Sequence, residues 1–337
     1  MISISVLLAT YNGEKYVAEQ LASIVSQTLP PCEIVVSDDQ SSDNTLAVVK
    51  AFARTSAVPI KVMVNSKNKG YAKNFLEGAQ HCGGDYVAFC DQDDVWMPHK
   101  LERLAKAAMS DKKPSMVFSD TLLVDQNLQA TGQTGFEFLK VRQTELDLIH
   151  SGELIQVLVR RPCVTGMTML CKRSRLLEII ELIPQELDLP HDYLLSMGFA
   201  AGGDYAYVDE ALVMYRQHAA NVIGMQRKNI SKDKKLQTPI EEVKLFNEDI
   251  LNEEKKIHFA LLATESFYSE QGHYVNWLSQ RLNFLQFRIS RRTKMSISGF
   301  FKVKPDFPDS STNYWKMWRR DIKSYIRLSF SKIGKSI

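Results

Sequence analysis

Short apolar runs alternate with segments of helical periodicity along the first 90 residues of the chain. Residues 5–9 and 86–89 have the length and apolar character of buried strands, and residues 33–37 and 60–64 are predicted to be strands as well. Apolar positions recur at helical spacing between them, in residues 17–25, 45–53 and 71–80. This βαβαβαβ order predicts an α/β fold with a parallel sheet and helices on both faces.

Polar side chains follow three of the four predicted strands. Thr10 and Tyr11 come directly after the first strand, Asp39 follows the second, and residues 91–94 follow the fourth. Because parallel strands point the same way, these side chains are expected at one edge of the sheet. Open α/β sheets bind their ligands outside the carboxyl ends of the strands, so this edge is the predicted ligand site.

Three carboxylates crowd the end of the fourth strand, where the sequence reads Cys-Asp-Gln-Asp-Asp-Val-Trp. Asp91, Asp93 and Asp94 repel one another, and a bound cation relieves that repulsion. Carboxylate oxygens are hard ligands, which favours Mg²⁺ or Mn²⁺. Taken alone, the same residues also fit a solvated acidic turn.

The composition is that of an ordinary globular protein, with 45% hydrophobic and 24% charged residues. A chain of 337 residues can build one large core and an appendage. Five scattered cysteines without Cys-x-x-Cys spacing favour a reducing compartment and argue against disulfides and structural zinc. The sequence begins without a signal-peptide pattern and contains no long apolar run, so we expect a cytoplasmic protein.

Two common nucleotide-binding classes are disfavoured by the first strand–helix turn, which reads Thr-Tyr-Asn-Gly. A nicotinamide-dependent dehydrogenase needs Gly-x-Gly-x-x-Gly at this point, and a P-loop enzyme needs Gly-Lys-Ser/Thr.

The first 220 positions resemble a family 2 glycosyltransferase with the Rossmann-like GT-A fold, which binds nucleotide sugars. The resemblance rests on ordered segments at residues 5–13, 35–45, 68–75, 84–96 and 215–221. Within that family, Asp-Gln-Asp-Asp-Val-Trp followed by Lys100 is similar to the bacterial rhamnosyltransferases that use dTDP-L-rhamnose.

For the donor, the resemblance implies contacts from the ends of the first strands and from a later segment. Tyr11 would stack on the pyrimidine base, Asp39 would accept a hydrogen bond from the base N3–H, and Lys73 would lie near the phosphates. Asp38 and Asp39 also fit an Asx-type turn without any ligand. The implied donor-binding residues are Ala9, Thr10, Tyr11, Asp39, Lys73, Asp91 and Arg216.

For the metal and the acceptor, the resemblance implies a second group of side chains. Asp93, Asp94 and His218 would hold the cation, although a lone histidine is equally often structural. Asp192 would be the general base, and an Asp at a helix start is also an ordinary cap. Gly166 and His191 would line the acceptor side, where the glycine also fits a plain tight turn.

The C-terminal third differs from the rest in charge. Residues 281–337 carry a net charge of +11 and residues 1–280 a net charge of −8. We expect a catalytic domain at 1–224 and a mostly helical, basic extension at 225–337. Within residues 313–337, Trp315 and Trp318 share a helical face flanked by Lys and Arg. This pattern favours contact with an anionic membrane over packing on the protein, and both over nucleic acid.

These expectations combine into an inverting, metal-dependent glycosyltransferase. It would move L-rhamnose from dTDP-L-rhamnose to a hydroxyl of a surface-polysaccharide or related glycan, including a lipid-linked acceptor, at the inner face of the plasma membrane. The alternatives are a donor that is another UDP- or dTDP-sugar, and an inactive relative that only binds nucleotide sugars or glycans.

Overall fold

The computed structural model describes residues 2–184, 189–218, 221, 255–266, 278–279 and 282. The chain divides into two units, Met1–Gln226 and Arg227–Ile337, and each is considered by itself. In the second unit, residues 255–266 are helical. The predicted membrane-contact segment, residues 313–337, lies outside the described residues, and the division at 224/225 stays a prediction.

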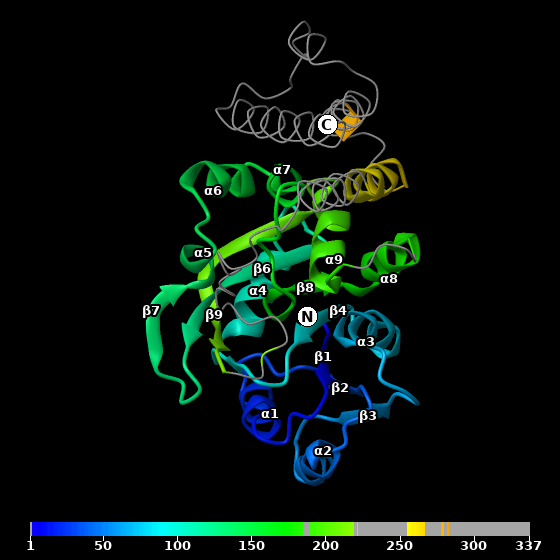
Figure 1. Cartoon of the computed structure of the whole chain (residues 1–337), viewed down its shortest axis with the longest axis vertical. Coiled ribbons are helices and arrows are strands. Elements are labelled where there is room, and N and C mark those ends of the chain that lie inside the picture. Colours follow the sequence, from blue (N-terminus) through cyan, green and yellow to red (C-terminus); the bar gives the residue numbers. More distant parts are fainter. Residues whose placement is uncertain are drawn as a thin grey trace, which may run out of the picture. The chain divides into compact units, whose positions relative to one another are not determined.

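The first half of the first unit has the predicted alternation of strands and helices. Its elements are β1 (Ile4–Thr10), α1 (Val17–Val25), β2 (Glu33–Asp38), α2 (Thr45–Ala53), β3 (Ile60–Val64), α3 (Tyr71–Gly78), the short 3₁₀ helix η1 (Ala79–His81) and β4 (Tyr86–Cys90). β1 pairs in parallel with both β2 and β4, and β2 pairs in parallel with β3. The predicted parallel sheet is therefore confirmed, in the order β3-β2-β1-β4 (Figure 1).

The second half extends this sheet with strands of both directions. The further elements are β5 (Val95–Trp96), α4 (Lys100–Ala108), β6 (Met116–Val124), β7 (Ala130–Thr134), α5 (Gly135–Phe138), α6 (Gln143–His150), α7 (Leu154–Leu158), η2 (Gly166–Thr168), β8 (Leu170–Lys172), α8 (Arg173–Leu182), α9 (His191–Ala200) and β9 (Tyr205–Arg216). β8 runs antiparallel to both β4 and β6, and β9 runs parallel to β6. Among the described residues the strands form one mixed sheet, in the order β3-β2-β1-β4-β8-β6-β9-β5 with β7 beside β6.

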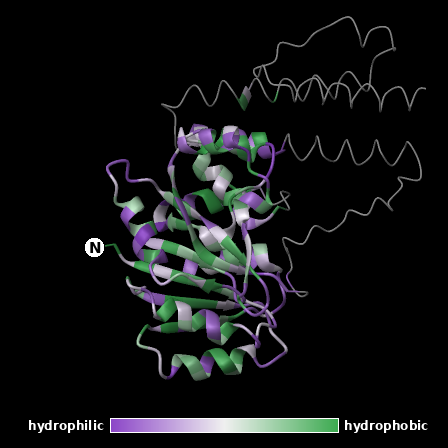
Figure 2. Ribbon diagram, turned by 90° about the vertical axis from the view of Figure 1, so that its left-hand side faces the viewer, coloured by the Kyte–Doolittle hydropathy of each residue, from purple (hydrophilic) through white to green (hydrophobic). Residues whose placement is uncertain are grey.

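Helices cover both faces of the sheet, and successive side chains of each strand point alternately towards one face and the other. Val6 and Leu8 of β1 belong to the core that includes Leu21 of α1 and Leu104 of α4. Leu7 points the other way, because a side chain added at Gly78 of α3 would lie 2.9 Å from it. Hydrophobic residues are concentrated in the strands, whereas hydrophilic residues dominate the surrounding loops (Figure 2). Both faces of β1, β2 and β4 are covered, which accounts for their continuous apolar sequences. β3 is the edge strand and is partly exposed.

Within the described residues, no helix is long and apolar enough to span a bilayer. All five cysteines are free thiols in this structure.

Candidate active site

The predicted acid loop, residues 91–94, begins directly after β4, at the carboxyl edge of the parallel strands. Asp94 is fully buried; its Oδ1 accepts the backbone N–H of Arg216 at 3.1 Å, while its Oδ2 is buried without a partner in the described part of the chain. Burial, followed by the charges of Asp93 and Asp91, raises the pKa of Asp94. A negative charge here therefore calls for a compensating cation or a proton.

Asp91 belongs to the same electrostatic cluster. Burial, followed by the charges of Asp93 and Asp192, raises the pKa of Asp91 to about 7, and Lys100 opposes the shift. Asp192, on α9, is therefore within electrostatic reach of the acid loop, although about 100 residues separate the two in sequence. The predicted base and the predicted donor side of the site are thus brought together.

His218 lies beside Asp93, with Nε2 2.8 Å from Asp93 Oδ2. Its imidazole stacks on the ring of Tyr16, with ring centroids 4.7 Å apart. The guanidinium of Arg216 lies against the same Tyr16 ring, 4.7 Å from its centroid. Tyr16 was not among the predicted site residues, yet it contacts both Arg216, the last residue of β9, and His218.

Arg216 is almost fully buried and connects several segments of the site. Nε donates to the backbone oxygen of Asp93 at 2.7 Å, Nη1 donates to the backbone oxygen of Gln126 at 2.8 Å, and Nη2 forms an ion pair with Glu19. These protein partners hold the acid loop against the end of β9. Arg216 thus has a structural role in addition to the predicted contact with the donor phosphates.

The end of β1 presents the predicted base-binding residues. Ala9 is half-buried at the strand end, Thr10 Oγ1 donates to Asp38 Oδ2 at 2.8 Å, and Tyr11 is 46% exposed. Gln92, from the acid loop, accepts from the backbone N–H of Tyr11 at 2.9 Å and donates to its carbonyl at 3.0 Å. This two-point contact, which sequence reasoning missed, pairs the acid loop with the end of β1 and leaves the Tyr11 ring free to stack.

Asp39 is almost fully buried at the end of β2 and gathers the loop that precedes α3. It accepts from the backbone N–H groups of Lys69 and Gly70, each at 2.8 Å, and from the side-chain amide of Asn65 at 2.9 Å. Gly70 has φ +81°, a conformation that favours glycine. Asp39 therefore holds the loop before α3 at the carboxyl edge of the sheet, where the ligand site is predicted. Its predicted contact with the base stays a prediction.

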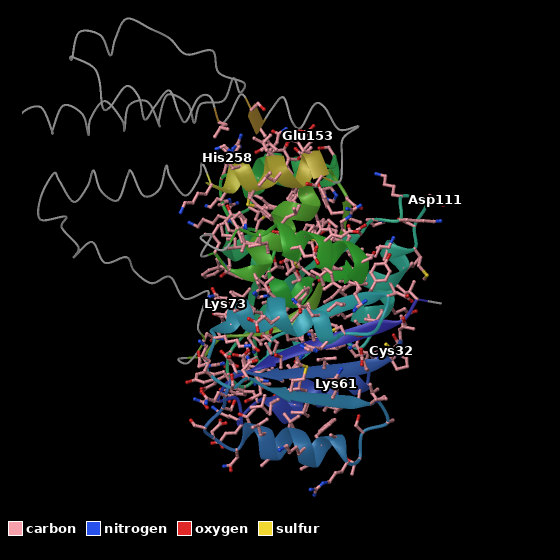
Figure 3. The ribbon with its side chains drawn as sticks, turned by 90° about the vertical axis from the view of Figure 1, so that its right-hand side faces the viewer. Cys32, Lys61, Lys73, Asp111, Glu153 and His258 are labelled. Atoms are coloured by element: carbon pink, nitrogen blue, oxygen red, sulfur yellow. The ribbon has the colours of Figure 1, made fainter. Side chains whose placement is uncertain are left out.

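Lys73 lies on the outside of α3 with an exposed side chain (Figure 3). Its neighbour Asn74 is buried and donates to the backbone oxygen of Ser37 at 2.8 Å. Within the described residues Lys73 forms no ion pair with the acid loop. Lys73 thus lies at the surface of α3, and its predicted contact with phosphate stays a prediction.

Asp192 is the second residue of α9, whose N-cap position is occupied by Pro190. Its Oδ2 accepts the backbone N–H of Gly166 at 3.0 Å, and its Oδ1 accepts the N–H of Tyr193 at 2.8 Å. Asp192 therefore lies two positions beyond the N-cap, but it still accepts an N–H of the first helical turn, and its role as the base stays a prediction. Each carboxylate oxygen keeps a lone pair beyond these two bonds, which a general base needs.

His191 and Gly166 pack tightly against each other, and the lack of space between them explains why residue 166 is a glycine. A Cβ on Gly166 would lie 2.7 Å from His191 Nε2. The His191 ring is buried and stacks on Phe75 at 4.1 Å, and neither ring nitrogen has a partner in the described residues. Burial lowers the pKa of His191 to about 4, so the imidazole is neutral at physiological pH.

Lys100 is the other site residue that sequence reasoning left without a role. Its side chain is fully buried, and Nζ donates to the backbone oxygen of Met167 at 2.6 Å. The ammonium lies 3.2 Å from the ring centroid of Trp96. Burial lowers the pKa of Lys100 to about 7, against the opposing effect of Cys90, Asp94 and Asp91.

The described residues contain no group of three or more His, Cys, Asp or Glu side chains in a metal-holding arrangement. The chemistry of the site still suits a hard divalent cation. Asp93 and His218 already adjoin, and Asp94 Oδ2 is a buried acceptor without a partner. Mg²⁺ is commonly held by one or two carboxylates together with substrate phosphates, so a small set of protein ligands fits.

Known proteins with related sequences and structures were compared with this chain. Residues 5–161 match the model of Glycosyl transferase family 2. The dTDP-rhamnosyl transferase RfbG of Shigella flexneri is 29% identical over 86% of this chain and 97% of its own length. The glucosyltransferase WfgD of Escherichia coli, which is named for UDP-Glc, is 34% identical over 29% of this chain and 38% of its own length.

Among solved structures, S. aureus TarS 1–349 in complex with UDP-GlcNAc superposes with a TM-score of 0.56 and 19% identity. That match covers 96% of this chain and 81% of the TarS chain, and it bears on the fold alone. Together with the mixed sheet and the acid loop at its edge, these findings identify residues 5–161 as a family 2 glycosyltransferase domain in a chain of the GT-A fold.

Proposed function

We propose that this glycosyltransferase, which uses a sugar-nucleotide donor, moves L-rhamnose from dTDP-L-rhamnose to a hydroxyl of a surface-polysaccharide or related glycan. RfbG supports the choice of donor, because the similarity extends over 97% of its length. The catalytic part of the proposal rests on one observation: His191, next to Asp192, packs against Phe89 near the end of β4 with ring centroids 5.7 Å apart, which brings the start of α9 close to the acid loop. A base and a leaving-group site on either side of one reacting carbon require this proximity.

The proposed reaction is a single displacement at the anomeric carbon, with inversion. Asp192 takes the proton of the acceptor hydroxyl, whose oxygen bonds to the anomeric carbon as the bond to the β-phosphate oxygen breaks. The nucleoside diphosphate leaves with the electron pair of that bond. Tyr11 stacks on the base and Asp39 accepts a hydrogen bond from its N3–H, while Gln92 holds the acid loop against the backbone of Tyr11.

Asp93 and His218, with Asp94 behind them, would hold Mg²⁺ or Mn²⁺. When bound, such a cation neutralises the negative charge that develops on the leaving pyrophosphate. Two contacts within the protein orient these proposed ligands: Tyr16 stacks on His218, and Arg216 holds the backbone of Asp93.

Donor hydrolysis tests the proposed function. We expect the purified chain with Mn²⁺ to hydrolyse dTDP-L-rhamnose faster than UDP-glucose, UDP-galactose or UDP-N-acetylglucosamine, with product release followed by chromatography. Faster hydrolysis of a UDP-sugar would replace the rhamnose donor by the kind of donor named for WfgD. Binding of nucleotide sugars without any hydrolysis or transfer would instead favour the inactive binding protein.

We further propose that residues 313–337 hold the enzyme at the inner face of the plasma membrane, close to lipid-linked acceptors. Each Lys or Arg near an anionic surface contributes about 1 kcal/mol, and Trp315 and Trp318 add apolar contact. Deleting 313–337 is expected to release the chain from anionic vesicles in a flotation assay, and high salt should release it in part. Equal flotation of the full-length and truncated chains would contradict this proposal.

A further inference from the structure

Lys100 is a buried lysine at the start of α4, on a helix face that is otherwise apolar. Leu101, Leu104, Ala105 and Ala108 are the other buried residues of this helix. Placing an ammonium group in such surroundings costs free energy, because the charge loses its hydration. A methionine would fill the same space without that cost, so the polar end of Lys100 calls for a specific explanation.

The Nζ atom of Lys100 contacts the short 3₁₀ helix η2. It donates to the backbone oxygen of Met167 at 2.6 Å, where it also lies over the ring of Trp96. A buried carbonyl that loses its donor is destabilised. Lys100 thus determines where the middle of η2 lies.

The preceding residue of the same turn holds the proposed base. The backbone N–H of Gly166 donates to Oδ2 of Asp192 at 3.0 Å. The turn itself is closed by the bond from Thr168 N to Thr165 O at 3.0 Å, which couples its residues to one another. Gly166 also lies close against His191, so a displacement of the turn cannot be absorbed by sliding over α9.

We propose that Lys100 is a positioning residue for transfer: it fixes the carboxylate of Asp192 through η2 and so sets the base against the acid loop. The proposal rests on the proposed function, in which Asp192 accepts the proton of the acceptor. In this role Lys100 acts through Met167 and Gly166, and it contributes to turnover without binding the donor. Its charge also acts on Asp91 and Asp94, and the double-mutant cycle below separates that effect from positioning of the base.

The test compares Lys100→Met with Lys106→Met, which makes the same change at an exposed position of the same helix. We expect Lys100→Met to lower kcat for transfer about 10²-fold, the scale of misplacing a catalytic group by about 1 Å. Lys106→Met is expected to keep wild-type turnover. Calorimetry with the nucleoside diphosphate and a thermal melt of each variant show whether donor binding and folding survive.

A double-mutant cycle separates positioning of the base from a general structural effect. If Lys100 acts through Asp192, Lys100→Met should cause no further loss in an Asp192→Asn background, measured as residual transfer at high enzyme concentration. An additive loss in that background would overturn the proposal, since it would place the effect of Lys100 elsewhere. Normal kcat in Lys100→Met would overturn it as well.

Gly166→Ala provides a second route to the same conclusion if Lys100→Met does not fold. Its added Cβ would press on His191 and displace η2 from the opposite side. We expect a similar loss of kcat and the same lack of additivity with Asp192→Asn. If Asp192→Asn itself transfers normally, the proposed function fails; if that variant is inactive while Lys100→Met and Gly166→Ala are normal, only the role of Lys100 is refuted.

Discussion

Asp192→Asn is expected to lose most of its transfer activity while it still binds the nucleotide sugar with near-normal affinity. The amide cannot accept the acceptor proton, and general base catalysis contributes typically about 10²- to 10⁴-fold. The group acts on the transition state, so kcat should fall and donor affinity should not. Calorimetry with the donor and a transfer assay on the same sample measure both quantities.

A structural effect of this substitution would have a different signature. The carboxylate of Asp192 accepts two backbone N–H groups, from Gly166 and Tyr193, and an asparagine can accept only one of them well. A thermal melt beside that of Asp111→Asn, an exposed aspartate, reveals any lost stability. Lost donor binding or a large drop in Tm would assign Asp192 to the architecture of η2 and α9 rather than to proton transfer.

Asp93→Asn is expected to lower turnover by about 10²-fold or more, the scale of removing one electrostatic stabiliser of a transition state. Asp93 Oδ2 lies 2.8 Å from Nε2 of His218, and the substitution removes one of the two adjoining groups proposed to hold the cation. The variant should also need more Mn²⁺ for half-maximal activity. A Mn²⁺ titration of both proteins, read by transfer and by calorimetric binding of Mn²⁺, checks this.

Chelation provides the complementary experiment. The wild-type chain in saturating EDTA should lose activity to the same order as Asp93→Asn, and added Mn²⁺ should restore it. Undiminished activity of either sample would remove metal-assisted departure of the pyrophosphate from the mechanism. A shift in Tm would instead show that the substitution disturbs the contact between the acid loop and β9.

The parallel half of the sheet was predictable because its signal is local. β1, β2 and β4 are continuous apolar runs of strand length, and each is followed by a polar turn. The other half depends on pairing between distant segments. β8 has only three residues and pairs with β4 and β6 on either side, so its place in the sheet depends on this pairing more than on its own sequence.

The candidate site divides in the same way. Residues on the strand ends, such as Thr10 and Asp93, were located by the rule that ligands bind at the carboxyl edge. Gln92, Tyr16 and Lys100 were missed, because each acts on the backbone or ring of a segment far away in sequence. The motif Trp-x-x-x-Lys was visible, but nothing in the sequence alone says that the lysine turns inward.

The position of Arg216 late in the chain affects the order in which the site folds during synthesis. The parallel strands β1 to β4 lie within the first 90 residues, but the guanidinium that holds the acid loop belongs to the last residue of β9. During synthesis the acid loop therefore emerges more than a hundred residues before the arginine that holds it in place. A nascent chain at that stage has the acidic residues without the guanidinium that holds them, so the acid loop reaches its final contacts only after β9 has joined the sheet.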